Sequence, residues 1–175
     1  MIIYTGIGSR ETPENILLIF EELGKTLGEK GFLLRSGHAE GADISFENSC
    51  DISNGKKEIY LPWYRFNNSN SNYCNIPNKV FEFASTYFKY WENMKRSTQK
   101  LMARNCQQVL GFNLDIETNF IVCYTKEGKL LGGTSQALRI AKDKNIKVFN
   151  AGSYFDMNKF KNDVLDYSNL LLAGN

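Results

Sequence analysis

Three glycine-containing segments occupy the same kind of place in this chain, each just after a short apolar run and just before a stretch with helical periodicity. They are Gly6-Ile7-Gly8-Ser9-Arg10, Ser36-Gly37-His38-Ala39-Glu40-Gly41-Ala42-Asp43 and Gly132-Gly133-Thr134-Ser135. In a parallel sheet this placement brings all three to the carboxyl edge of the strands, where backbone N–H groups and helix N-termini bind phosphates and riboses. The pattern predicts a parallel α/β fold with a pocket for a nucleotide-type ligand.

Apolar runs and turn-forming residues indicate where the strands and helices lie. Strands are expected at 2–4, 32–34, 58–61, 120–124 and 146–149, and helices at 13–30, 42–53, 80–106 (with a break near residue 93), 135–144 and 157–171. Strands that alternate with helices at this spacing favour a parallel sheet with right-handed crossovers and helices on its faces. The segment 62–78, rich in asparagine and aromatic residues, is predicted to be a long loop or lid.

Composition limits the number of domains and the classes of binding partner. With 175 residues, 42% of them hydrophobic and 23% charged, the chain suits one domain over 1–175, with the glycine segments in a core of 1–151 and a closing helix at 157–171. The 21 basic and 19 acidic residues give a net charge of +2. This balance is too even to predict broad binding to a phosphate backbone, so a nucleic-acid partner is possible only through a local patch.

Cysteine and histidine usage argues against a metal site. The four cysteines form no CxxC motif, and His38 is the only histidine. We therefore expect reduced thiols, a cytoplasmic location, no metal and no cofactor. No segment reaches the roughly 18 apolar residues of a membrane span, so no membrane partner is expected. We also expect a homo-oligomer.

The first segment combines a tight turn with polar side chains. Gly6 and Gly8 permit the turn and the close approach of a phosphate, while Ser9 adds a hydroxyl and Arg10 a fork of donors for a phosphate or carboxylate. The segment lacks the third glycine and the downstream acid of the dinucleotide fingerprint, which disfavours a standard NAD site. An ordinary strand-to-helix turn with a surface arginine is the alternative.

The second segment is the more specific. Its candidate ligand contacts are Ser36, Gly37, His38, Gly41 and Asp43. Asp43 opens a helix, where the dipole stabilises a carboxylate that can also accept from a ribose hydroxyl. His38 is either a polar ligand contact or an exposed loop residue. Glu47 lies one turn after Asp43, so these two are the candidate catalytic carboxylates, with a solvated acidic face as the alternative.

The third segment again opens a helix with small residues, an arrangement that receives anions. Its candidate contacts are Gly132, Gly133, Thr134 and Ser135. Only six of the 21 basic residues are arginine, and four of them lie in or beside the predicted site elements: Arg10, Arg35, Arg104 and Arg139. This bias favours specific donors over a diffuse basic surface, and we include Arg104 and the neighbouring Asn105 among the ligand-binding candidates.

These motifs resemble the SLOG superfamily, the Rossmann-like group that joins the Smf and DprA recombination mediators with the LOG phosphoribohydrolases. Gly8-Ser9-Arg10 resembles its GSR, residues 36–43 resemble its SGxAxGxD, and Gly132-Gly133-Thr134 resembles its GGT. Ser45-Phe46-Glu47, Leu61-Pro62-Trp63 and Ala103-Arg104-Asn105 with Leu110-Gly111 resemble small single-domain members found in phages and bacteria. The resemblance covers about residues 1–151 and implies the fold and a nucleotide-like ligand.

The resemblance leaves three functions open. The first is binding of a nucleotide or nucleotide-derived signal, as a sensor or a sponge in phage defence or counter-defence. The second is cleavage of a nucleotide N-glycosidic bond, although the PGGxGTxxE pattern of LOG enzymes has no counterpart to its proline or glutamate here. The third is DprA-like binding of single-stranded DNA, for which Trp63, Tyr64, Arg65 and Phe66 would supply stacking and charge.

Overall fold

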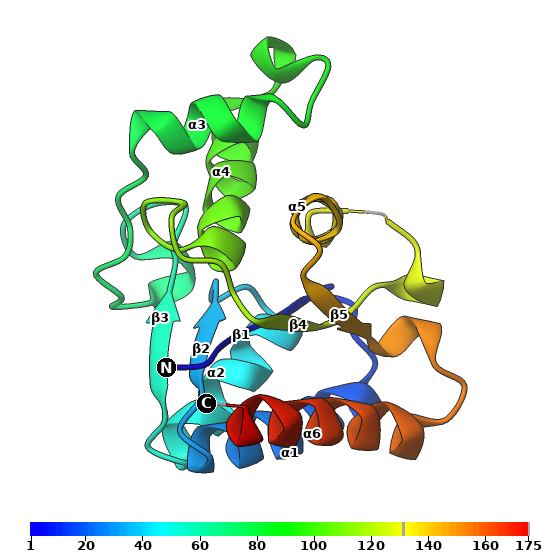
Figure 1. Cartoon of the computed structure of the whole chain (residues 1–175). Coiled ribbons are helices and arrows are strands. Elements are labelled where there is room, and N and C mark those ends of the chain that lie inside the picture. Colours follow the sequence, from blue (N-terminus) through cyan, green and yellow to red (C-terminus); the bar gives the residue numbers. More distant parts are fainter. Residues whose placement is uncertain (131, 175) are drawn as a thin grey trace.

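The computed structural model describes residues 1–130 and 132–174, and a five-stranded parallel sheet lies at its centre. Its order is β3-β2-β1-β4-β5 (Figure 1). The strands are β1 (Ile3–Gly8), β2 (Leu33–Ser36), β3 (Lys56–Ile59), β4 (Phe120–Tyr124) and β5 (Lys147–Asn150). Every neighbouring pair is parallel, which confirms the predicted Rossmann-like class. The chain builds outward from β1 to one side and then returns to the other, so β1 and β4 flank the point where the strand order reverses.

Helices cover both faces of the sheet. They are α1 (Glu14–Glu29), α2 (Ala42–Ile52), α3 (Asn78–Ser85), α4 (Arg96–Leu110), α5 (Thr134–Asp143) and α6 (Met157–Ala173). Figure 1 shows α1 and α6 on one side of the sheet and α4 and α5 on the other, with α3 packed on α4. No helix within the described part of the chain is long and apolar enough to cross a membrane.

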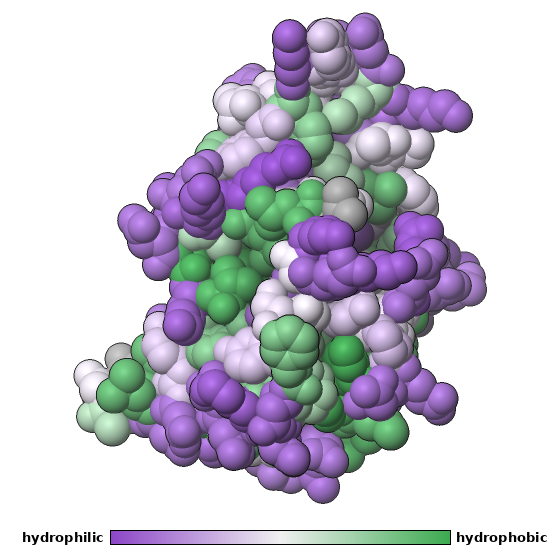
Figure 2. All heavy atoms as spheres, turned by 90° about the vertical axis from the view of Figure 1, so that its right-hand side faces the viewer, coloured by the Kyte–Doolittle hydropathy of each residue, from purple (hydrophilic) through white to green (hydrophobic). Residues whose placement is uncertain are grey.

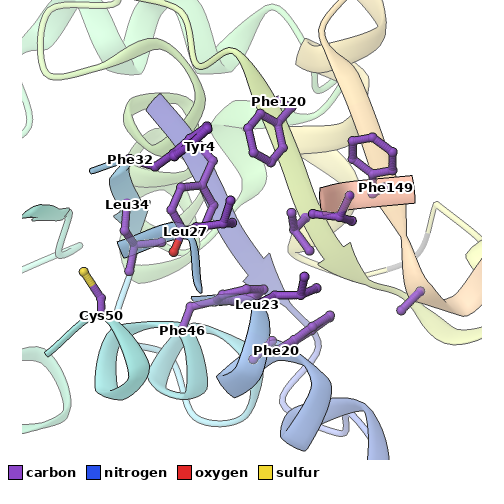
Figure 3. Close-up of a cluster of buried hydrophobic side chains, with 14 of the residues drawn as sticks. Tyr4, Phe20, Leu23, Leu27, Phe32, Leu34, Phe46, Cys50, Phe120 and Phe149 are labelled. Carbon is purple, nitrogen blue, oxygen red and sulfur yellow. The ribbon is translucent and has the colours of Figure 1, made fainter. Parts of the chain in front are cut away.

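Each face of the sheet has its own core because successive strand side chains point to opposite faces. Phe120 and Val122 of β4 join the core under α1, α2 and α6, part of which is drawn in Figure 3. Ile121 and Cys123 join the core under α4 and α5. A strand buried on both faces is a continuous apolar run, which is why 120–124 was recognisable as a strand.

Some predicted boundaries were wrong. The helix predicted over 80–106 consists of α3, a single 3-10 turn at Trp91–Asn93 and α4, which confirms the break near residue 93 but extends the last helix to Leu110. The third strand begins and ends two residues earlier than predicted, at 56–59 rather than 58–61. Its pairing with β2 explains this difference, since Leu33 lies opposite Lys56 and Ser36 opposite Ile59.

Figure 2 shows the face of the molecule that lies to the right in Figure 1, where apolar side chains gather left of the centre and hydrophilic ones cover much of the rest.

Gly6 has a packing role in the sheet. A Cβ atom at this position would lie 2.5 Å from Cγ of Phe46, whose ring stacks on Phe20 with centroids 4.5 Å apart. Because Phe46 is fully buried in α2, it cannot move aside cheaply. The absence of a side chain at Gly6 therefore lets α2 pack directly on β1.

We expect Gly6→Ala to lower the free energy of unfolding by roughly 1–3 kcal/mol, because the added methyl group overpacks the core. Gly133→Ala is the matched control, since its Cβ would meet nothing closer than 3.7 Å and its φ of −63° suits alanine. Urea unfolding monitored by circular dichroism measures both variants. Equal losses in the two would show that Gly6 is not constrained by packing.

Candidate functional site

The three glycine segments meet at the carboxyl edge of the sheet around a cavity of about 460 Å³. It lies where β1 ends and where α2 and α5 begin, with α4 as a wall. Nine of the predicted ligand contacts line it: Gly8, Ser9, Arg10, Asp43, Arg104, Asn105, Gly132, Gly133 and Thr134. A cavity of this size at the point where the strand order reverses is the usual place for a small ligand in an open α/β sheet.

Asp43 lies in the first turn of α2 and its carboxylate is directed to the end of β1. Its Oδ1 accepts from the N–H of Gly8 at 3.2 Å, and its Oδ2 lies 3.5 Å from a terminal nitrogen of Arg104. Burial raises the pKa of Asp43, and the guanidinium of Arg104 and the backbone N–H groups of Gly8 and Ala39 act in the opposite direction. The carboxylate thus joins β1, α2 and α4 at the floor of the cavity.

Arg104 projects from α4 and is only 4% exposed. Burial lowers its pKa while Asp43 raises it, and a guanidinium stays charged through such a shift. Its Nε is buried and has no hydrogen-bond partner among the described residues. A buried donor without a partner is costly, and such groups are rare in folded proteins.

Gly37 leaves room for this guanidinium. A Cβ at Gly37 would lie 1.3 Å from Nη1 of Arg104, so any other residue there would displace the arginine. The amide of Gln108 completes the surroundings: with its oxygen turned toward the donors, it accepts from the N–H of Gly37 at 3.0 Å and from Arg104 at 3.1 Å. The amide nitrogen then donates to Oδ1 of Asn105 at 3.0 Å. The second glycine segment and α4 are therefore built around one buried side chain.

The N-terminus of α5 faces the same cavity. Gly132 has a φ of +70°, which glycine adopts without strain, and Gly133 and Thr134 open the helix. Asn105 ties α4 to this turn by donating from Nδ2 to the carbonyl of Gly133 at 2.9 Å. The first-turn N–H groups and the helix dipole favour an anion at such a position.

Six predicted contacts support the cavity from outside its described lining: Gly6, Ser36, Gly37, His38, Gly41 and Ser135. The hydroxyl of Ser36 donates to the carbonyl of Gly6 at 2.7 Å. Gly41, at a φ of +82°, lets the loop approach the carbonyl of Ser9, which would lie 2.7 Å from a Cβ at this position. The hydroxyl of Ser135 donates to the carbonyl of Gly132 at 2.6 Å.

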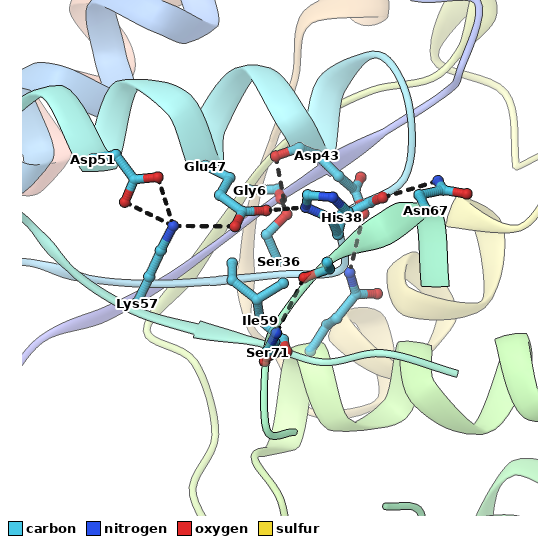
Figure 4. Close-up of polar contacts among 12 residues, drawn as sticks. Gly6, Ser36, His38, Asp43, Glu47, Asp51, Lys57, Ile59, Asn67 and Ser71 are labelled. Atoms are coloured by element: carbon cyan, nitrogen blue, oxygen red, sulfur yellow. Dashed lines mark hydrogen bonds and ion pairs between the residues drawn. The ribbon is translucent and has the colours of Figure 1, made fainter. Parts of the chain in front are cut away.

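Glu47 does not join Asp43 at the cavity, contrary to the prediction from their spacing. Figure 4 shows its carboxylate between Lys57 and His38. The distances are 3.0 Å to Nζ of Lys57 and 2.6 Å to Nδ1 of His38. Lys57 also pairs with Asp51 at 2.7 Å. Both Glu47 and His38 thus hold the second glycine segment to α2 and β3 from outside the described lining of the cavity.

The prediction included Arg104 and Asn105 of α4 but missed the other residues that this helix contributes to the cavity wall. Leu101, Met102 and Gln108 line the cavity together with Ile7, Glu11 and Ala39. On a helix, positions three, four and seven residues apart share one face, so Leu101, Arg104 and Gln108 point the same way. That spacing around Arg104 was the signal that could have found them. In residues 1–130 and 132–174, no cluster of three or more His, Cys, Asp or Glu side chains is placed to hold a metal ion.

Comparison with known proteins supports the fold. No protein-family model matches the chain, and no curated protein matches it. Among solved structures, DNA processing protein A from Helicobacter pylori aligns with a TM-score of 0.57 at 18% identity over 94% of this chain and 80% of that one. The molybdenum cofactor carrier protein from Chlamydomonas reinhardtii aligns with a TM-score of 0.50 at 17% identity over 86% and 76%. At these identities the likeness shows a shared Rossmann-like fold.

We expect Asp43→Asn to destabilise the protein by roughly 3 kcal/mol at pH 7, because it leaves the buried charge of Arg104 without its counter-ion. Arg104→Met should lower the stability by a similar amount, because it leaves the buried carboxylate of Asp43 without its counter-ion. The double variant should lose clearly less than the sum, since neither charge then remains buried alone.

Urea unfolding of the four proteins measures this coupling. Lys25→Met, which removes an exposed pair with Glu29 at 3.9 Å, serves as the control and should change stability by less than about 0.5 kcal/mol. Additive losses in the double variant would contradict a coupled pair.

Proposed function

We propose that this protein binds a small anionic ligand of the nucleotide class in the cavity between the three glycine segments. The observation that carries the proposal is that Arg104, a cation only 4% exposed, lines the cavity where α5 begins. Arg10 lies on the same cavity, so two guanidinium groups and a helix N-terminus converge on one space. Phosphate groups match such donors in both charge and geometry.

The rest of the lining suits the remainder of a nucleotide. Leu101, Met102, Ile7 and Ala39 provide apolar surface against which a base can pack. Asp43 and Asn105 provide an acceptor and an amide for hydroxyl groups of a ribose. About 460 Å³ accommodates a mononucleotide.

The solved structures with this fold support ligand binding of two kinds. One is named as a carrier of the molybdenum cofactor, a small molecule, and the other is described by its binding of single-stranded DNA. Together with the motifs GSR, SGxAxGxD and GGT, they support our proposal that the chain is a SLOG member. A role as sensor or sponge for a nucleotide-derived signal in phage defence or counter-defence is the finer part of this proposal. Homo-oligomerisation and a cytoplasmic location stay predictions.

N-glycosidic cleavage is the weaker candidate because neither of the two candidate carboxylates on α2 is free to act. Glu47 is held by His38 and Lys57, and Asp43 is engaged by Gly8 and Arg104. A general acid or a nucleophile must reach the reacting bond, which places it on the cavity lining. The other carboxylate in the described lining is that of Glu11, an exposed residue.

Calorimetry with adenosine 5′-monophosphate tests the proposal. We expect binding that Arg10→Ala weakens by about 1.5 kcal/mol, or roughly tenfold, through loss of a charge-assisted contact. Gly133→Val should abolish binding with an unchanged melting temperature, because its Cβ meets only Met102 and Asn105, at 3.7 and 3.9 Å, and the larger side chain fills cavity space. Chromatography of the mixture should return the nucleotide intact. Full affinity in both variants would exclude this cavity, and released adenine would favour the glycosidase.

A single-stranded oligonucleotide separates the small-ligand proposal from DprA-like binding. With a net charge of +2, we expect little change in fluorescence anisotropy at about 150 mM salt. Submicromolar binding that is weakened by Trp63→Ala and Arg65→Ala but not by Gly133→Val would instead favour DNA binding along the 62–78 segment. If only Gly133→Val abolished oligonucleotide binding, the binding site would instead be the cavity.

A further inference from the structure

The loop from Leu61 to Tyr73, after β3, carries one buried aromatic side chain, that of Phe66. The N–H of Leu61 donates to the carbonyl of Tyr73 at 2.8 Å, so the loop between them closes on itself. Within it, Phe66 is 5% exposed, whereas the neighbouring Tyr64 is 71% exposed. The asparagine-rich composition of this loop does not by itself explain why a single ring is held inside.

The backbone around Phe66 is held in an uncommon conformation. Arg65, Asn67 and Asn68 have φ values of 57°, 48° and 66°, in the left-handed region that residues other than glycine rarely adopt. Such conformations persist where surrounding contacts over-determine them, and they concentrate around binding sites. The contacts of this loop therefore indicate which part of the site its conformation supports.

Two contacts connect this loop to residues at or beside the cavity. The ring centroid of Phe66 lies 5.8 Å from Cζ of Arg104, within the range of a cation–π contact. The side-chain amide of Asn67 donates to the carbonyl of His38 at 3.1 Å (Figure 4). The loop is thus anchored beside Gly37, whose missing side chain makes the space that the Arg104 guanidinium occupies.

We propose that Phe66 is a positioning residue for Arg104, and that the loop after β3 sets the ligand affinity of the cavity without touching the ligand. Phe66 is not among the described residues that line the cavity. The contact of Arg104 with Asp43 is long, at 3.5 Å, and its Nε has no partner in the described chain. The closer polar contact is with the Gln108 amide oxygen, at 3.1 Å from one terminal nitrogen, and it leaves the tilt of the guanidinium plane weakly defined. The ring of Phe66 lies within cation–π distance of the guanidinium and favours the position that keeps the two groups together. This inference rests on the proposed function for its effect on binding.

The first test needs no ligand. In the ¹⁵N-labelled protein, the Nε–H resonance of Arg104, assigned by its absence from Arg104→Gln, should exchange slowly with water because the group is buried. Phe66→Leu should shift this resonance, through loss of the ring current, and speed its exchange. Tyr64→Leu is the matched control in the same loop and should leave it in place. An unmoved and still protected resonance in Phe66→Leu would overturn the proposal.

The second test measures coupling in binding. Phe66→Leu should weaken adenosine 5′-monophosphate binding by about 3- to 30-fold, the range expected for a partly desolvated cation–π contact. In an Arg104→Gln background, the same change should have no further effect on affinity. Equal losses in both backgrounds would show that Phe66 acts on the fold in general rather than on Arg104.

Two safeguards keep the outcomes distinct. If Phe66→Leu does not fold, Phe66→Met keeps the apolar volume without the ring and takes its place in both tests. If the wild-type protein does not bind adenosine 5′-monophosphate, the proposed function fails for that nucleotide, whereas the Nε–H resonance still decides whether Phe66 positions Arg104.

Discussion

The buried pair of Asp43 and Arg104 is the interaction on which the site depends. It joins the first turn of α2 to the middle of α4 across the carboxyl edge of the sheet, and neither charge has a stable place there without the other. The cavity, the glycine at position 37 and the amide of Gln108 are all arranged around it. Because this ion pair holds its side chains in place before a ligand binds, less conformational entropy is lost on binding.

The glycines of the three segments serve two different purposes. Gly6, Gly37 and Gly41 remove side chains that would collide with Phe46, Arg104 and the carbonyl of Ser9, so they hold the layers of the protein together. Gly132 and Gly133 meet no such obstacle and leave open space at the start of α5. A glycine that leaves open space beside a helix N-terminus permits a ligand to approach the backbone, whereas one that avoids a collision permits packing.

The loop after β3 contacts both the second glycine segment and Arg104. It packs Phe66 near Arg104 and bonds Asn67 to the backbone of His38, while the ring of His38 contacts Glu47, which in turn pairs with Lys57. The second glycine segment is therefore supported by α2, β3, α4 and the loop. Polar groups that appeared suited to chemistry in the sequence, above all Glu47 and His38, have structural partners in the folded chain.

The amino-acid sequence by itself determined the α/β class, the approximate places of the strands and helices, and the edge of the sheet where the glycine segments meet. These follow from short-range patterns, such as the continuous apolar run at 120–124 and the small residues before each helix. Only the tertiary structure decided that Asp43 lines the cavity and Glu47 does not, and that Leu101 and Gln108 join the predicted Arg104 in its wall. The reason is physical: side chains one helical turn apart can have different partners, and those partners come from β3, α4 and the loop after β3, which meet only when the sheet is assembled.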